Sequence, residues 1–125
     1  MKIALATPWP PQHTGIADYA YDLACGLTRQ GHGVTVITEA TDPKPADGVQ
    51  FITPETFDTA HYANFDKLVY QLGNNSSFHV FQIAMLPRFP GVVHLHDMVL
   101  HHLMAWLIYL HGSLEFYRHV IAKWY

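Results

Sequence analysis

Short apolar runs alternate with amphipathic stretches along the chain. Residues 3–6 are continuously apolar and predict a buried strand, which the prolines of the following loop end. Over 16–27 the apolar residues recur every three or four positions, which predicts one face of a helix that ends at Gly31. A β-branched run at 34–38 predicts the next strand. Strand, helix and strand in this order predict a βαβ unit with parallel strands.

The rest of the chain continues this alternation. Further strands are expected at 49–53, 68–72 and 92–97, the last of them buried, and further helices at 74–86, 98–111 and 112–125. Asp97 stands where it would cap the helix over 98–111. The pattern predicts an α/β fold with a Rossmann-like, open, mainly parallel sheet and helices on both faces.

Ligands bind such sheets at the carboxyl ends of the strands. The loops 8–15, 73–75 and 96–97 each follow a predicted strand. We therefore expect these three segments to lie along a single edge of the sheet.

Composition excludes several classes of protein. The chain has 125 residues, half of them apolar, which fits a single folded domain at most. A net charge of −3, with only seven scattered Lys and Arg, supplies no basic stripe for nucleic acid. The lone Cys25 is expected to be a small core residue in a reducing compartment. The apolar start is too short for a signal peptide, and the run at 104–110 is too short to span a membrane.

Gly15 opens the first predicted helix. Without a Cβ it lets a group such as a diphosphate approach the backbone, and the free N–H groups of a helix start favour an anion. A glycine can also stand there only to make the turn. The dinucleotide fingerprint G-x-G-x-x-G is absent after this strand, which argues against an NAD enzyme.

A cluster of histidines occupies "HLHDMVLHH" at 94–102. In a strand, His94 and His96 point to the same face, as metal-binding HxH pairs do. The spacing departs from the H-x-H-x-D-H of zinc hydrolases, and ten histidines in one chain also cluster by chance. We therefore assign no metal ligands and keep a metal-dependent hydrolase as the less favoured alternative.

Two asparagines follow the middle strand in "GNNSSFH" at 73–79. Asparagine and serine cap helices well, and capping explains at least one of the pair. Because two successive asparagines exceed what a cap needs, we expect Asn74 and Asn75 to bind a hydroxylated ligand.

The pieces "PWPPQHTGIADY", "LGNNSSFH" and "PGVVHLHDMVLHHL" together resemble the N-terminal half of a GT-B glycosyltransferase, most closely the retaining, nucleotide-sugar-dependent enzymes of family 4. The resemblance covers most of the chain. It implies that Thr14, Gly15, His96 and Asp97 face the sugar donor, with His96 as the catalytic residue. Many relatives carry a second glycine where this chain has Thr14.

The same resemblance implies an acceptor side. Its expected contacts are Trp9, His13, Asn74, Asn75 and His79. The acceptor is expected to be a glycan, a lipid-linked sugar or a small molecule. The donor is a nucleotide sugar, typically a hexosyl one, and no further cofactor is expected.

Family members also carry a second Rossmann-like domain that binds the nucleotide sugar, and 1–125 contains no counterpart of it. We therefore expect a partial N-terminal, acceptor-side domain that is inactive alone. The full enzyme would be cytoplasmic, with peripheral association with the inner membrane face.

One alternative is a stand-alone binding or self-assembly module, whose apolar helix over 98–111 packs on a partner or on a second copy. Light scattering would distinguish a monomer from a dimer, and metal analysis would test the hydrolase.

Overall fold

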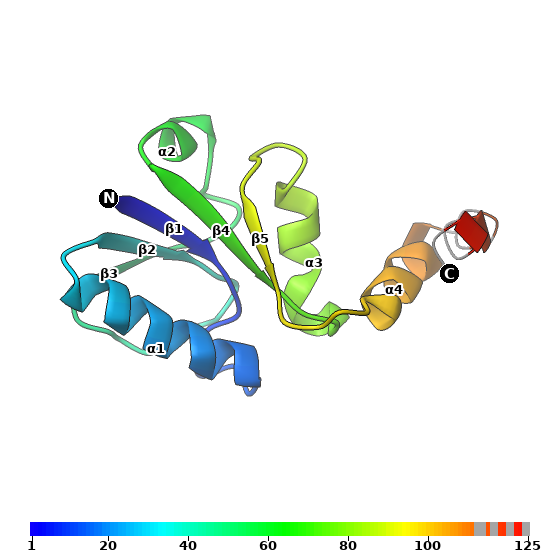
Figure 1. Cartoon of the computed structure of the whole chain (residues 1–125), viewed down its shortest axis with the longest axis horizontal. Coiled ribbons are helices and arrows are strands. Elements are labelled where there is room, and N and C mark those ends of the chain that lie inside the picture. Colours follow the sequence, from blue (N-terminus) through cyan, green and yellow to red (C-terminus); the bar gives the residue numbers. More distant parts are fainter. Residues whose placement is uncertain (112–114, 116–117, 120–121, 124–125) are drawn as a thin grey trace.

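A computed structural model describes residues 1–111, 115, 118–119 and 122–123 (Figure 1). Its elements are β1 (Lys2–Ala6), α1 (Gly15–Arg29), β2 (Gly33–Ile37), β3 (Val49–Ile52), α2 (Thr59–Ala63), β4 (Lys67–Leu72), α3 (Ser76–Met85), β5 (Val92–Leu95) and α4 (His101–His111). The strands form one parallel sheet in the order β3-β2-β1-β4-β5. The α/β prediction is confirmed. The helix predicted over 112–125 falls mostly outside the described residues.

Each face of the sheet has its own hydrophobic core. Alternate residues of a strand point to opposite faces, so Ile3 and Leu5 pack with Ala20 and Ala24 of α1. Ala4 and Ala6 point the other way. Their core partners include Leu68 and Tyr70 of β4, Phe81 and Met85 of α3, and Phe57 and Phe89 of the loops. Helices therefore cover both faces, as the sequence predicts.

The short helix α2 was not predicted from the sequence. It has only five residues, too few for apolar residues to repeat along one face. Asp58 caps it by accepting a hydrogen bond from the backbone N–H of His61 at 2.9 Å.

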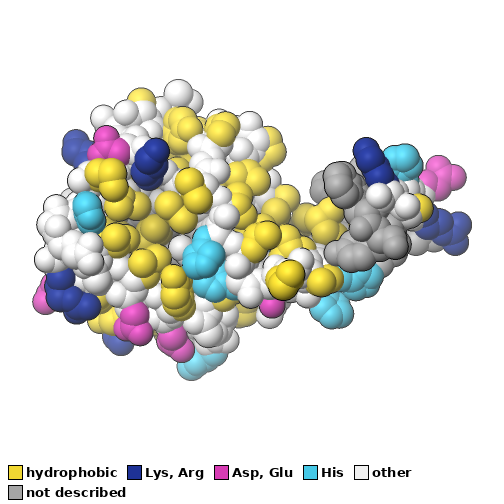
Figure 2. Space-filling view, in the orientation of Figure 1, with side chains coloured by type: hydrophobic (Ala, Val, Ile, Leu, Met, Phe, Trp, Pro, Cys, Tyr) yellow, Lys and Arg dark blue, Asp and Glu magenta, His cyan; other side chains and the backbone are white. Residues whose placement is uncertain are grey.

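The strand β5 lies at an open edge of the sheet, and the prediction that it is buried is wrong. Val92 and Leu95 are each more than half exposed. Figure 2 shows hydrophobic side chains gathered on the viewed face of the sheet, with histidine side chains beside them. An edge strand has a neighbour on one side only, which leaves its apolar side chains poorly covered.

The helix α4 extends from the sheet beside α3 (Figure 1). Leu103 and Ile108 are buried, whereas Tyr109 is 83% exposed. The helix begins at His101, later than predicted.

Among the described residues, every helix is too short or too polar to cross a membrane.

Candidate polar site at the carboxyl edge of the sheet

The segments 73–75 and 96–97 meet where β4 and β5 end, as predicted. The backbone N–H of His96 donates to the carbonyl of Leu72 at 2.9 Å, which extends the pairing by one residue beyond β5. The backbone N–H of Asn74 donates to Oδ2 of Asp97 at 2.8 Å. The first turn of α1 lies at the same place. Cδ1 of Ile16, in that turn, is so close to Gly73 that an added Cβ would collide with it.

Buried glutamines, which sequence reasoning missed, organise this edge. Gln82 of α3 donates from Nε2 to the carbonyls of Ala6 and Gln71, each at 2.7 Å. Its Oε1 lies 2.7 Å from Nδ1 of His79. Gln82 thus joins the ends of β1 and β4 to a buried imidazole. The available signals were Gln71 inside an apolar strand and Gln82 three positions after His79 on one helix face.

His96, the predicted catalytic residue, is held by the second glutamine. Its Nε2 lies 2.6 Å from Oε1 of Gln71. Gln71 is fully buried, and its Nε2 has no hydrogen-bond partner among the described residues. Partial burial lowers the pKa of His96, and the rings of His94 and His79 act in the same direction, against Asp97.

His94 and His96 lie side by side, as their spacing predicts, with ring centroids 4.4 Å apart. The ring of Tyr19, from α1, stands edge-on to both, at 5.6 Å and 5.0 Å. Through these contacts Tyr19, a partly exposed residue of α1, packs on the end of β5. Among the described residues, no group of three or more His, Cys, Asp or Glu side chains could hold a metal ion.

Asp97 has a different structural role from the predicted one. It binds the turn after β4 instead of capping the next helix, so the predicted cap is wrong. Asn74 supplies a long-range contact to that helix, because its Oδ1 accepts from the N–H of Leu103 at 3.1 Å, in the first turn of α4. Asn75 caps α3 through the N–H of Ser77, at 2.9 Å.

The loop before α1 separates into a buried and an exposed part. Trp9 is fully buried, where its ring packs on Tyr21 and Phe51 and its Nε1 donates to the carbonyl of Lys44 at 2.9 Å. The structure therefore gives this indole a packing role and leaves it no surface for an acceptor. His13 is exposed, and Thr14 caps α1 by accepting from the N–H of Ile16 at 3.3 Å.

Two glycines of the edge differ in what surrounds them. A Cβ at Gly15 would meet no atom within 4 Å, and the backbone there does not have a positive φ. Neither packing nor a left-handed turn therefore requires Gly15. At Gly73 an added Cβ would lie 2.9 Å from Nε2 of His79 and 3.1 Å from Oδ2 of Asp97. Gly73 thus lets two polar groups approach the backbone.

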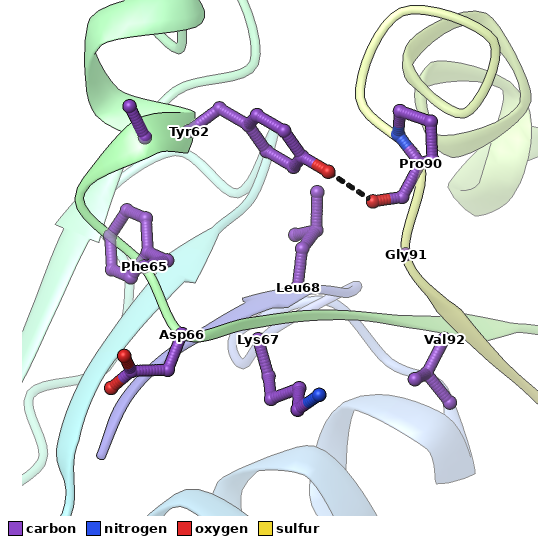
Figure 3. A pocket seen from close by; sticks show the side chains of 9 residues that line it. Tyr62, Phe65, Asp66, Lys67, Leu68, Pro90, Gly91 and Val92 are labelled. Carbon is purple, nitrogen blue, oxygen red and sulfur yellow. Dashed lines mark hydrogen bonds between the residues drawn. The ribbon is translucent and has the colours of Figure 1, made fainter.

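Two hollows among the described residues lie at the other end of the sheet. One of about 380 Å³ is at the amino ends of β4 and β5, where the Tyr62 side chain reaches across to Pro90 (Figure 3). Another of about 590 Å³ lies beside the start of β2. Neither of these two hollows is lined by a predicted site residue. They and the polar cluster therefore lie at opposite ends of the sheet.

Comparison with protein-family models, with curated proteins and with solved structures gave no match.

Proposed function

We propose that this chain forms the acceptor-side domain of a retaining glycosyltransferase that uses a nucleotide sugar. The observation that carries the proposal is the polar cluster at the carboxyl edge, where His79, His96 and Asp97 gather beside the start of α1. Parallel α/β sheets bind their ligands at this edge. The resemblance of "TGIADY", "GNN" and "LHD" to family 4 enzymes supports the choice of reaction.

The donor diphosphate would approach the N-terminus of α1. The first N–H groups of a helix attract an anion. Those of Ile16 and Ala17 already donate to Thr14, so the anion would meet the N–H of Gly15 first, where the described residues leave open space. In the reaction, the bond between the sugar and the diphosphate would break, and the nucleoside diphosphate would leave with the bonding electrons. The acceptor oxygen would form the new bond on the same face, and the leaving diphosphate would take up the proton of the acceptor hydroxyl. His96 would stabilise charge that develops near the donor sugar.

The acceptor would bind the remaining polar groups. His13 and Asn75 are exposed near the start of helices, whereas His79 is 1% exposed, so an acceptor would reach it only at Nε2, beside Gly73. Sugar hydroxyls both donate and accept hydrogen bonds, so a cluster rich in acceptors suits them. A second domain would supply the nucleotide site.

A titration followed by NMR tests this proposal. Inorganic pyrophosphate and a panel of nucleotide sugars should shift the backbone amides of Gly15, Ile16 and Ala17. Gly15→Val should weaken that binding at least fivefold, because its side chain fills the approach to the helix N-terminus. Gly26→Val is the matched control, since Gly26 is in the same helix and also has no neighbour within 4 Å of an added Cβ. No shift at these amides, or equal weakening by both variants, would contradict the proposal.

We propose self-assembly as a second candidate, which the exposure of β5 and α4 favours. Val92, Leu95 and Leu110 are each more than half exposed, and burying an apolar side chain of this size stabilises association by about 1.5 to 3 kcal/mol. Light scattering across a concentration series checks it: a dimer supports assembly, and a monomer at every concentration rules it out.

A further inference from the structure

The orientation of the Gln82 amide follows from its neighbours. One end faces the backbone carbonyls of Ala6 and Gln71, each at 2.7 Å. Carbonyl oxygens only accept hydrogen bonds, so that end must be the NH₂ group. The other end, which faces His79, is therefore the oxygen.

This orientation determines where His79 carries its proton. Nδ1 of His79 lies 2.7 Å from Oε1 of Gln82, an atom that only accepts. Nδ1 must therefore be the donor. Burial lowers the pKa of His79, which favours the neutral ring, although Gln82, Asp97 and the backbone carbonyl of Gln71 act against this shift. A neutral imidazole protonated on Nδ1 has a free lone pair on Nε2.

That lone pair lies at the carboxyl edge of the sheet. Nε2 of His79 is beside Gly73, at the place that a Cβ would occupy, together with Oδ2 of Asp97. The absence of a side chain at Gly73 is what allows both acceptors to come close to the backbone.

We propose that Gln82 is a positioning residue that holds His79 in the Nδ1–H tautomer, so that Nε2 accepts a hydrogen bond from a ligand hydroxyl at this edge. The tautomer is argued from the hydrogen bonds of Gln82 with His79, Ala6 and Gln71. The nature of the ligand, a sugar hydroxyl of the acceptor, rests on the proposed function.

Gln71 complements this arrangement. Its Oε1 faces Nε2 of His96, while its Nε2 is a buried donor to which the described part of the chain offers no partner. A buried donor that lacks a partner costs about 1 to 3 kcal/mol, and a ligand oxygen that reaches it would recover part of that cost. The edge thus combines acceptors on His79 and Asp97 with a donor on Gln71, and a sugar hydroxyl can serve either kind of group.

NMR of the chain labelled with ¹⁵N in its histidine rings tests the tautomer directly. Correlations between ring nitrogens and ring carbon-bound protons distinguish Nδ1–H from Nε2–H. At pH 7.5 we expect His79 as Nδ1–H, with an unprotonated Nε2. The Nε2–H form, or a protonated ring at this pH, would overturn the proposal without any variant.

The positioning role is tested with Gln82→Met. In the folded variant, His79 should populate both tautomers, whereas the exposed Gln30→Met should leave the wild-type tautomer in place. An unchanged Nδ1–H tautomer in folded Gln82→Met would show that Gln82 is not needed. If Gln82→Met does not fold, the wild-type measurement decides.

Addition of a panel of methyl hexosides tests the ligand. At least one should shift the Nε2 resonance of His79 and leave that of His32, near the amino terminus, unchanged. If none does, the acceptor role is wrong, while the tautomer stands. The pyrophosphate titration at Gly15 reports separately on the proposed function.

Discussion

The two ends of the sheet differ in what their polar groups do. At the amino end, Asp66 and Lys2 exchange hydrogen bonds with each other, and the hydroxyl of Tyr62 donates to the carbonyl of Pro90 at 2.7 Å. These contacts hold loops in place around an open hollow. At the carboxyl end, buried glutamines hold two imidazoles whose pKa values are lowered. In this sheet the hollow of the amino end therefore lies away from the perturbed histidines of the carboxyl end.

The largest difference between the two ends should appear when a hydrogen-bonding side chain is removed. Gln82→Met removes hydrogen bonds to groups on three elements, each of which contributes about 0.5 to 1.5 kcal/mol. We expect the free energy of unfolding to fall by about 2 to 4 kcal/mol in denaturant titrations. Tyr62→Phe, at the exposed amino end, should cost about 1 kcal/mol or less. Similar losses of stability for the two variants would show that the hydrogen bonds of the two ends contribute equally to the fold.

The amino end contains a glycine, Gly91, whose replacement should lower the stability of the fold. A Cβ at Gly91 would lie 2.5 Å from the carbonyl oxygen of Leu68 and 3.0 Å from Cε2 of Tyr70. Because the first neighbour is backbone, Gly91→Ala should lower the free energy of unfolding by about 1 to 3 kcal/mol. A variant as stable as the wild type would mean that β5 can move away from β4 at little cost.

The pH dependence of stability should arise mainly at the carboxyl end. The pKa values of His79 and His96 are lowered on folding, chiefly by burial, so the folded state resists protonation of these rings. Their contribution is complete above the unfolded pKa of about 6.5 and is lost as the pH falls through the folded values. Thermal unfolding between pH 7.5 and 5 should show this loss.

His79→Gln should make the thermal stability depend less on pH, even if it also changes the stability at pH 7.5. His13→Gln, at an exposed position, serves as the control. A profile with the same slope in wild type and His79→Gln would assign the pH dependence to other groups.

The smallest effect is expected at Gly15, with the opposite sign. An alanine there meets no neighbour and needs no unusual φ, so Gly15→Ala should raise the free energy of unfolding by about 0.4 to 1 kcal/mol through the unfolded state. Together with weaker pyrophosphate binding by Gly15→Val, this gain would show that the glycine serves a ligand rather than the fold. A loss of stability in Gly15→Ala would favour the turn-making interpretation.

Much of the architecture was predictable, because it depends on local patterns. The alternation of apolar runs and amphipathic stretches predicts the five strands and their parallel order along the chain. The position of His96 at a strand end follows from the same pattern, and so does its closeness to His94. The open edge at β5 was not predictable, since an apolar run indicates burial without saying which strand lies outermost.

The fold class, the edge at which the loops meet and the glycine that opens α1 could all be predicted from the sequence. The packing of Trp9 in the core, the hydrogen bond of Asp97 to the turn after β4, and the contacts of Gln71 and Gln82 with the histidines could be seen only in the folded chain. Such contacts join residues that are far apart in the sequence: Gln82 bonds to a carbonyl 76 positions away, at Ala6. Hydrogen bonds of this kind depend on how a helix packs against a strand, which local periodicity does not encode.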